Sequence, residues 1–367
     1  MFRRGRAVMK GYHMKKIVLT GGGTAGHVTP NFALVPLLQE ADYDILYIGS
    51  KTGMEKKLVE EAGLRYEGIS SGKLRRYFSV KNFTDPFRVL KGFSEAKKIL
   101  KKYRPDVVFS KGGFVSVPVV YAAAKLHIPV ITHESDMTPG LANKLNLRKA
   151  DKICCNFPET AKGLPESKAV VSGCPIRKEL LEGDAAQGRE LTGFTQDKPV
   201  LMIIGGSLGS VRVNNAVRAA LPKLLEVFQV VHLCGRGNLD KSLEDTPGYV
   251  QFEYLTEELP HIFAMADIVI SRAGANAICE LVALAKPNVL IPLSREASRG
   301  DQILNAESFE RQGFSSVLEE EELVGDALVE RVLAVYADRE RYISAMKNSA
   351  HTDAARVIVD LIKENTP

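Results

Sequence analysis

Three glycine-rich turns are the segments of this sequence whose composition and spacing point most directly to chemistry. Residues 21–27 (GGGTAGH) follow the apolar run KKIVLT and precede a helical pattern. Main-chain amides and the positive end of a helix dipole make such a turn suitable for binding an anion. Residues 205–210 (GGSLGS) and 111–114 (KGGF) also follow apolar runs. Turns of this kind in both halves of the chain indicate two phosphate-bearing ligands.

The first turn also matches the letters of a dinucleotide-binding fingerprint, G-x-G-x-x-G, through Gly21, Gly23 and Gly26. A dinucleotide site needs an acidic residue at the end of the second strand, where it binds the ribose. That strand, DILYIGS, ends in glycine and serine, and the nearest acid, Glu55, is badly placed. The match is therefore weak, and a tight strand-to-helix turn without a ligand is the alternative.

Composition excludes several functional classes. The chain has 367 residues, of which 45% are hydrophobic, a net charge of +5, and no apolar run near the roughly 20 residues of a membrane-spanning helix. So mild a charge does not indicate nucleic acid as a partner. The five cysteines show no CxxC spacing, so a reducing cytoplasm is expected. Asp42 and Asp44 form a D-x-D pattern, but they precede a strand, where acidic turn residues are common, so we expect no metal ligation.

The elements that must position these turns alternate between strand and helix patterns. One series starts at Met14 and a second after Pro175. This alternation predicts an α/β fold of two Rossmann-like, doubly wound parallel-sheet domains facing across a cleft. The predicted parts are an N-terminal extension (1–13) without the apolar core of a signal peptide, an N-terminal acceptor domain (14–175), a C-terminal donor domain (176–350), and a C-terminal helix end (351–367) that is a candidate to return to the N-terminal domain.

Seven motifs, found in order from Met14 almost to the C-terminus, resemble the MurG family of glycosyltransferases. They are GGGTAGHVTP, SKGGFVSVP, HESDMTPGLAN, GCPIR, GGSLGS, SRAGANAICELVALAKP and RGDQILNA. The resemblance implies a GT-B fold and a hexosyltransferase. It also implies inverting transfer of N-acetylglucosamine from UDP-N-acetylglucosamine to the C4 hydroxyl of the N-acetylmuramoyl residue in undecaprenyl-diphospho-muramoyl-pentapeptide, which converts lipid I to lipid II in peptidoglycan synthesis. No cofactor or metal is implied.

An inverting transfer needs a base that removes the proton of the attacking hydroxyl. His27 is the candidate, because a histidine titrates near neutrality and this one lies where the turn becomes a helix. Capping or packing at the helix start is the alternative. By family position, acceptor contacts are implied for Gly22, Gly23, Thr24, Gly112 and Gly113.

Donor contacts are implied for Thr24, Gly26, Asp136, Arg177, Gly206, Ser207, Leu255, Glu280, Asp301 and Gln302. Arg177, Ser207 and the Gly206 amide would stabilise the charge that grows on the leaving diphosphate. By the same resemblance, Glu280 binds the ribose hydroxyls, the backbone of Leu255 reads uracil, and Asp301 with Gln302 selects the sugar. Asp301 and Asp136 are departures, since some relatives have glutamine and asparagine there.

Residues 73–104 interleave apolar side chains with many lysines and arginines. Leu74, Phe78, Phe83 and Phe87 are the candidates for insertion into an anionic membrane surface. Together with the resemblance, this predicts a peripheral protein at the cytoplasmic face of the bacterial membrane. An amphipathic helix with a solvated basic face is the alternative.

Two other functions fit part of this pattern. A UDP-N-acetylglucosamine 2-epimerase also pairs two such domains around a UDP-sugar, but it needs no lipid acceptor. A non-catalytic UDP-sugar-binding paralogue would keep the fold without turnover. The presence of His27, Arg177, Ser207 and Glu280 argues against the paralogue.

Overall fold

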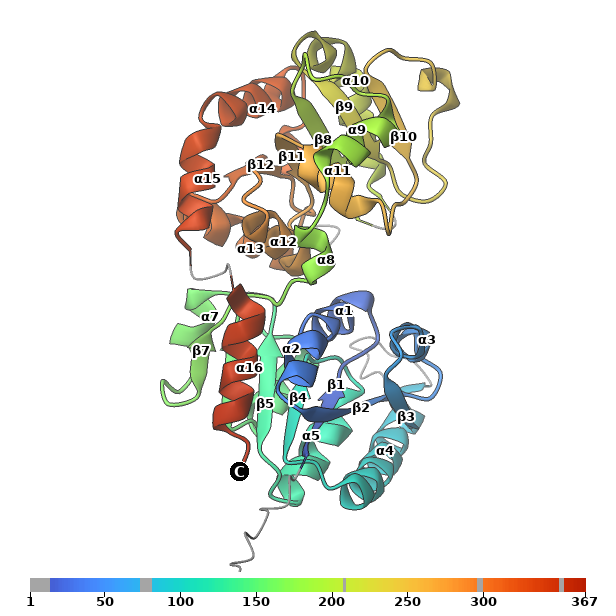
Figure 1. Ribbon diagram of the computed structural model, residues 1–367, viewed down its shortest axis with the longest axis vertical. Helices are drawn as coiled ribbons and strands as arrows, with labels where there is room; N and C mark the ends of the chain where they lie inside the picture. The colour runs from blue at the N-terminus through green and yellow to red at the C-terminus, as the bar shows by residue number, and fades with distance from the viewer. Residues whose placement is uncertain (1–13, 73–80, 207–208, 296–299, 350–352) are drawn as a thin grey trace, which may run out of the picture. The chain divides into compact units, whose positions relative to one another are not determined.

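Each predicted series of strands forms one sheet (Figure 1). The computed structural model describes residues 14–72, 81–206, 209–295, 300–349 and 353–367. The strand order is β3-β2-β1-β4-β5-β6-β7 in the first sheet and β10-β9-β8-β11-β12-β13 in the second. Paired strands run parallel in both sheets. The prediction of two doubly wound α/β domains is therefore confirmed.

The strands of the first sheet lie between residues 15 and 171. They are β1 (Lys15–Thr20), β2 (Tyr43–Ser50), β3 (Arg65–Ile69), β4 (Val107–Ser110), β5 (Val130–Glu134), β6 (Lys152–Cys155) and β7 (Ala169–Val171). The helices that accompany them are η1 (Ala25–His27), α1 (Thr29–Phe32), α2 (Val35–Glu40), α3 (Met54–Glu61), α4 (Lys81–Tyr103), α5 (Ser116–Lys125), α6 (Leu141–Leu147) and α7 (Pro158–Lys162).

The second sheet is shorter but has the same plan. Its strands are β8 (Val200–Ile204), β9 (Gln229–Leu233), β10 (Tyr249–Phe252), β11 (Ile268–Ser271), β12 (Asn288–Leu290) and β13 (Ser316–Val317). The remaining helices are α8 (Lys178–Leu181), α9 (Ala185–Thr192), α10 (Val211–Val227), η2 (Lys241–Leu243), α11 (Leu259–Met265), α12 (Ala275–Ala283), α13 (Asp301–Arg311), η3 (Glu320–Glu322), α14 (Ala327–Ala337), α15 (Arg339–Lys347) and α16 (Ala354–Glu364).

The central strands are apolar along their length because helices cover both of their faces. The stretches Ile17–Leu19 and Val200–Ile203 are completely buried. In the second half of the chain α10 packs on α14 and α9 on α11, and these helices cover the strands (Figure 1). Burying apolar strands in this way leaves only the loops at the strand ends available to ligands.

Both sheets reverse their strand order between the first and fourth strands of the series. The reversal lies between β1 and β4 in one sheet and between β8 and β11 in the other. In open α/β sheets a crevice forms outside the carboxyl ends of the strands at such a switch point. The turns at 21–27 and 111–114 leave β1 and β4, and the turn at 205–210 leaves β8. All three glycine-rich turns therefore lie where this fold binds ligands.

The chain groups into two compact units. One contains the residues up to Ile131 with Arg148–Asp151 and Val359–Pro367, and the other contains Thr132–Leu147 with Lys152–Ile358. The predicted domains, 14–175 and 176–350, follow the division of the strands between the sheets, whereas the compact units place part of the segment before 175 with the second sheet. The C-terminal residues belong to the first unit, where the Thr366 and Tyr43 hydroxyls lie 2.7 Å apart.

Candidate active site

In the first unit two glycine-rich turns touch through their backbones. A side chain on Gly113 would place its Cβ 2.1 Å from the carbonyl oxygen of Gly22, and Gly113 has a φ of +84°. Only glycine fits both the conformation and the space. Gly22, Gly112 and Gly113 are buried, whereas Gly23 and Thr24 are exposed. The predicted acceptor residues therefore come together in one place.

His27 follows this turn, in η1, and its ring is oriented by the turn after β4. Its Nδ1 lies 3.2 Å from the carbonyl oxygen of Lys111. A carbonyl oxygen only accepts, so Nδ1 carries the proton and Nε2 carries the lone pair. Burial, assisted by the charge of Lys111, lowers the pKa of His27 to about 4, although the hydrogen bond to Lys111 acts in the opposite direction. The imidazole is therefore neutral at pH 7 and has an unprotonated Nε2, as a general base requires.

Glu55 fixes the other side of the first turn. Its carboxylate accepts hydrogen bonds from the amide of Gly23 (3.3 Å) and from the amide and hydroxyl of Ser50 (2.9 and 2.5 Å). Its side chain is completely buried. The acid nearest to the position of a dinucleotide site's ribose contact is thus engaged in holding the turn. Its position five residues beyond Ser50 gave no indication of this role.

In the second unit the turn after β8 leads into α10. Ser210 caps this helix by accepting from the amide of Val213 (3.4 Å), and the guanidinium of Arg272 donates to the Ser210 hydroxyl (2.6 Å). Gly206 is exposed with a φ of +83°. A capped helix of 17 residues behind a glycine turn is a suitable anion site. Ser207 lies outside the described residues.

Arg272 was not singled out by the sequence, yet it ties together the loops at this edge of the second sheet. Besides Ser210 it donates to the carbonyl oxygens of Ile291 (3.0 Å) and Pro292 (3.1 Å) and pairs with Glu320 (2.5 Å). Both members of that ion pair are largely buried. The SRAG motif contains this arginine, but the sequence does not show which loops it joins.

Glu280 lies on α12 beside two residues of the GCPIR motif. Burial is the main cause that raises its pKa to about 7; the neighbouring Cys174 adds to the rise, and the charge of Arg177 opposes it. The Cys174 thiol donates to the side-chain oxygen of Asn276 (3.4 Å), one helical turn before Glu280. Two predicted donor residues, Arg177 and Glu280, are thus brought together.

Of the remaining predicted donor residues, Asp136 and Gln302 have hydrogen bonds within the second unit. Asp136 donates its amide to Glu134 (3.0 Å) and accepts from the side chain of Asn305 (3.4 Å), all within the second unit. Asp301 begins α13, and the side-chain carbonyl of Gln302 accepts from the amide of Leu293 (3.1 Å). Leu255 is 9% exposed, which suits a role for its backbone only. Gly26 belongs to η1.

Acidic, histidine and cysteine side chains do not gather into a group able to hold a metal ion within the ranges that the structure describes. Asp44 of the D-x-D pattern pairs instead with Arg65. Across the same ranges, every helix is too short or too polar to cross a membrane.

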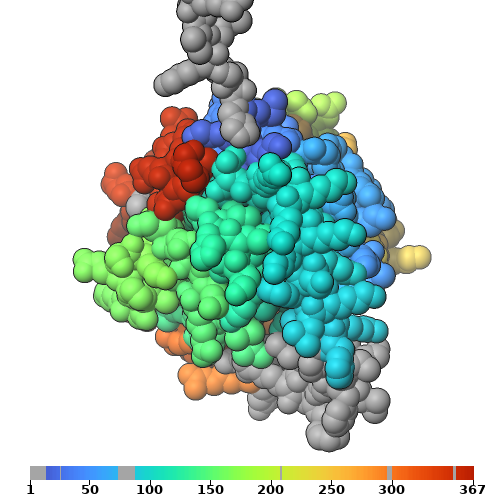
Figure 2. Space-filling model, turned by 90° about the horizontal axis from the view of Figure 1, so that it is seen from below, coloured from blue at the N-terminus to red at the C-terminus, as the bar shows by residue number. Residues whose placement is uncertain are grey.

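The apolar and basic segment contains α4, whose exposed residues include Phe87 (74%) and Leu90 (66%). They are flanked by exposed Arg88 and Lys91, while Gly92 is buried. Figure 2 shows the face of the first unit to which the residues of α4, in cyan, contribute. Leu74 and Phe78 lie outside the described residues, as does the side chain of Phe83.

Comparison with known proteins identifies the family. The model of the glycosyltransferase family 28 N-terminal domain matches residues 17–155, and the model of its C-terminal domain matches residues 200–361. Relatives named UDP-N-acetylglucosamine–N-acetylmuramyl-(pentapeptide) pyrophosphoryl-undecaprenol N-acetylglucosamine transferase include one from Lachnospira eligens, 64% identical over 96% of this chain and 100% of its own length. Another, from Clostridium tetani, is 56% identical over 95% of this chain and 98% of its own length.

Solved structures agree with this family. The MurG structure of Acinetobacter baumannii superimposes with a TM-score of 0.74 and 26% identity, covering 95% of this chain and 99% of that one. A UDP-N-acetylglucosamine 2-epimerase from Neisseria meningitidis gives a TM-score of 0.68 at 15% identity, covering 96% of this chain and 100% of that one, a likeness that shows the fold alone. By both domain models and by its full-length relatives, the chain belongs to glycosyltransferase family 28 and, within it, to the MurG family.

Proposed function

We propose that this chain transfers N-acetylglucosamine from UDP-N-acetylglucosamine to the pyrophosphoryl-undecaprenol-linked N-acetylmuramyl pentapeptide, the step that makes lipid II for peptidoglycan. It is a hexosyltransferase. The observation that carries the reaction is identity of 56–64% over nearly the whole chain with transferases named for it. At this level of identity over nearly the full length of both chains, the substrates named for the relatives are the substrates expected here.

The reaction is tested directly with purified protein, UDP-N-acetylglucosamine and a synthetic acceptor that carries the muramoyl pentapeptide diphosphate on a short lipid. Formation of the disaccharide and of UDP is measured with and without the acceptor. UDP release that depends on the acceptor is expected. Release that is independent of the acceptor would instead indicate hydrolysis or the chemistry of an epimerase, and the transferase assignment would fail.

The base in this proposal is His27, which takes the proton of the C4 hydroxyl at Nε2 while the sugar is transferred with inversion. Support comes from the Nδ1 contact with Lys111, which leaves the lone pair on Nε2. Asparagine at this position keeps a donor where Nδ1 stands but has no group at the position of Nε2. His27→Asn should therefore lower turnover by about 100- to 10,000-fold while UDP affinity stays the same. Retained turnover in His27→Asn would remove the base assignment.

The donor is assigned to the turn after β8, with Arg177 at the diphosphate and Glu280 at the ribose. Main-chain amides, the positive end of α10 and one guanidinium supply positive potential for the leaving UDP. This set can stabilise the leaving group without a metal ion. Activity in the presence of EDTA should accordingly equal activity in the presence of Mg²⁺, and a loss in EDTA that Mg²⁺ restores would contradict this part of the proposal.

We also propose that α4 brings the enzyme to the cytoplasmic face of the membrane, where its acceptor resides. Phe87 and Leu90 would enter the lipid interface while Arg88 and Lys91 attract anionic headgroups. Replacing both apolar residues by serine should weaken binding to anionic vesicles and spare turnover of a short-lipid acceptor. Val324→Ser, at a residue of the second unit that is 71% exposed, is the matched control. Unchanged vesicle binding in the double variant would refute the assignment.

A further inference from the structure

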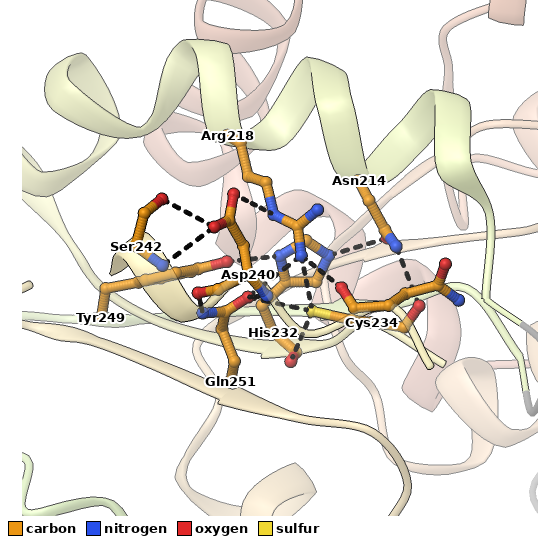
Figure 3. Close-up of polar contacts among 9 residues, drawn as sticks. Asn214, Arg218, His232, Cys234, Asp240, Ser242, Tyr249 and Gln251 are labelled. Carbon is orange, nitrogen blue, oxygen red and sulfur yellow. Dashed lines mark hydrogen bonds and ion pairs between the residues drawn. The ribbon is translucent and has the colours of Figure 1, made fainter. Parts of the chain in front are cut away.

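A buried polar cluster lies directly beside the β8 turn in the second unit (Figure 3). Three elements contribute to it: α10 supplies Asn214 and Arg218, β9 supplies His232, and β10 supplies Tyr249. His232 is completely buried, and Asn214 and Tyr249 are 2% and 3% exposed. The chemistry of the transfer assigns no role to these side chains, although burying so many polar groups is costly unless all are hydrogen-bonded.

The hydrogen bonds of this cluster can run in only one direction. Asn214 donates from its side-chain nitrogen to the carbonyl oxygen of Cys234 (2.8 Å), so its side-chain oxygen faces Nε2 of His232 (3.0 Å). That oxygen only accepts, and Nε2 must therefore carry the ring proton. Nδ1 is then the acceptor for the Tyr249 hydroxyl at 2.9 Å. The series of hydrogen bonds runs from Tyr249 through His232 and Asn214 to the carbonyl oxygen of Cys234, the residue after β9.

The imidazole of His232 stays neutral at physiological pH. Burial, assisted by the charge of Arg218, lowers the pKa of His232 to about 3. Both ring nitrogens already have partners, so a second ring proton, on Nδ1, would require the Tyr249 hydroxyl to change from donor to acceptor. The direction of the hydrogen bonds is thus the same throughout the physiological pH range.

The series of hydrogen bonds ends at the Cys234–Gly235 peptide, against which Gly209 of the β8 turn packs. A Cβ on Gly209 would lie 1.9 Å from the Cys234 carbonyl oxygen and 3.0 Å from the Cα of Gly235, and Gly209 has a φ of +70°. The turn after β8 therefore packs its backbone against the Cys234–Gly235 peptide. The orientation of that carbonyl, which Asn214 holds, decides where Gly209 can lie.

A second arm of the cluster holds the far end of the same segment. The guanidinium of Arg218 donates to the carbonyl oxygen of Asn238 (2.5 Å) and to the side chain of Gln251 (3.0 Å). Gln251 in turn accepts from the amide of Asp240 (3.1 Å) and donates to its carbonyl oxygen (2.9 Å). The residues between Cys234 and Asp240 are thus clamped at both ends, which gives the β8 turn a rigid surface to rest on.

We propose that Tyr249, His232 and Asn214 are positioning residues that hold Gly209 of the β8 turn, through the Cys234 carbonyl, where its backbone helps to receive the donor diphosphate. The inference rests on the proposed donor role of that turn. None of the three side chains needs to touch UDP. Their contribution is to fix main-chain amides in advance, so that binding the diphosphate costs little reorganisation.

Two substitutions of His232 separate positioning from general stability. Glutamine has a donor at the position of Nε2 and so keeps the link to Asn214, whereas asparagine reaches only the position of Nδ1 and keeps the link to Tyr249. We expect His232→Asn to raise the Kd for UDP about tenfold, roughly the worth of one net hydrogen bond, and His232→Gln to change it by less than about threefold. Both variants lose buried contacts, so both should melt below the wild type.

The matched control is Gln229→Leu, at the opposite end of β9. Gln229 is 6% exposed, and its side chain bonds to Thr195 (2.8 Å) and Lys198 (3.1 Å), which precede the amino end of β8. It should lower the melting temperature and leave UDP affinity unchanged. Equal UDP affinity in the two His232 variants, or weakened affinity in Gln229→Leu, would overturn the positioning role.

A spectroscopic measurement on the wild-type protein tests the direction of these hydrogen bonds. Long-range ¹⁵N–¹H spectra distinguish protonated from unprotonated imidazole nitrogens, and Tyr249→Phe assigns the His232 signal because it removes the partner of Nδ1. The Nε2–H form is expected from pH 8 to pH 5 in the wild type; an Nδ1–H form would refute the argument. A wild-type protein that binds no UDP would instead refute the donor role of the turn, an outcome distinct from UDP binding that is insensitive to His232.

Discussion

The backbone contact between the two glycine turns of the first unit gives a prediction whose size can be worked out. Gly113 and Gly23 have almost the same backbone conformation, with φ values of +84° and +89°. An added Cβ would lie 2.1 Å from the Gly22 carbonyl oxygen at Gly113 but would meet nothing within 4 Å at Gly23. Alanine at both positions therefore bears the same conformational cost, and only Gly113→Ala adds a clash.

The conformational cost of a left-handed alanine is about 1–2 kcal/mol. At Gly113 the two backbones must also move apart by roughly 1 Å to reach van der Waals contact, a type of overpacking that costs about 1–3 kcal/mol. Gly113→Ala should therefore lower the free energy of unfolding by about 2–5 kcal/mol and Gly23→Ala by about 1–2 kcal/mol. For a domain of this size each kcal/mol shifts Tm by about 2–4 °C.

Thermal unfolding followed by circular dichroism measures the difference, and hydrogen exchange locates it. Faster exchange in Gly113→Ala is expected at the carboxyl ends of β1 and β4, where the two turns begin. Gly63→Ala is the control for conformation alone, because Gly63 has a φ of +70°, has open space around it, and follows α3 away from both turns. Equal destabilisation by the Gly113 and Gly23 substitutions would refute the reasoning, since it would mean that the turns do not press on each other.

Two further predictions concern pH. The pKa of His232 is lowered to about 3 in the folded chain, so on acidification the unfolded chain binds a proton first, and stability that is present above pH 6.5 is lost as the pH falls. Between pH 7 and pH 5 the free energy of unfolding should decrease by about 2 kcal/mol from this group. Urea unfolding of His232→Gln should lack this contribution. Glu280 has a pKa raised to about 7, so its carboxylate becomes ionised between pH 6 and pH 8 and accepts ribose hydroxyls more strongly. Calorimetry should then show UDP affinity rising over this range in the wild type and staying flat in Glu280→Gln; parallel profiles would contradict the ribose assignment.

The sequence predicts the fold because most strands are short apolar runs and the turns at 21–27, 111–114 and 205–210 are rich in glycine. It also indicates the candidate acceptor glycines and His27, since they lie in two glycine-rich motifs, GGGTAGHVTP and SKGGFVSVP. The role of Glu55 was missed because its partners, Gly23 in the turn after β1 and Ser50 at the end of β2, come together only through the parallel pairing of these two strands. A carboxylate that serves the backbone has no spacing of its own in the sequence.

The cluster around His232 could not be predicted from the sequence, for a related reason. Its strand residues alternate with apolar neighbours, as those of any buried strand do, and the register of β9 and β10 is needed to set His232 opposite Gln251. Asn214 and Arg218 are four residues apart on α10, a spacing that many helices contain. Only the combination of strand register and helix face shows that these side chains meet, and neither is encoded in a local pattern.

The glycine turn of the first unit is held by a carboxylate, whereas that of the second unit is held by neutral groups. This difference bears on which turn receives the donor. In the first unit the Gly23 amide already donates to the Glu55 carboxylate, so an anion at that amide must compete with a resident acceptor. In the second unit the turn rests on a neutral chain of hydrogen bonds that ends at a backbone carbonyl. These hydrogen-bonded groups carry no negative charge, so the positive potential of the β8 turn and of α10 remains available to stabilise a diphosphate. By this argument we expect the donor diphosphate in the second unit, whereas the carboxylate-backed turn of the first unit suits the hydroxyl-bearing sugar that we propose beside His27.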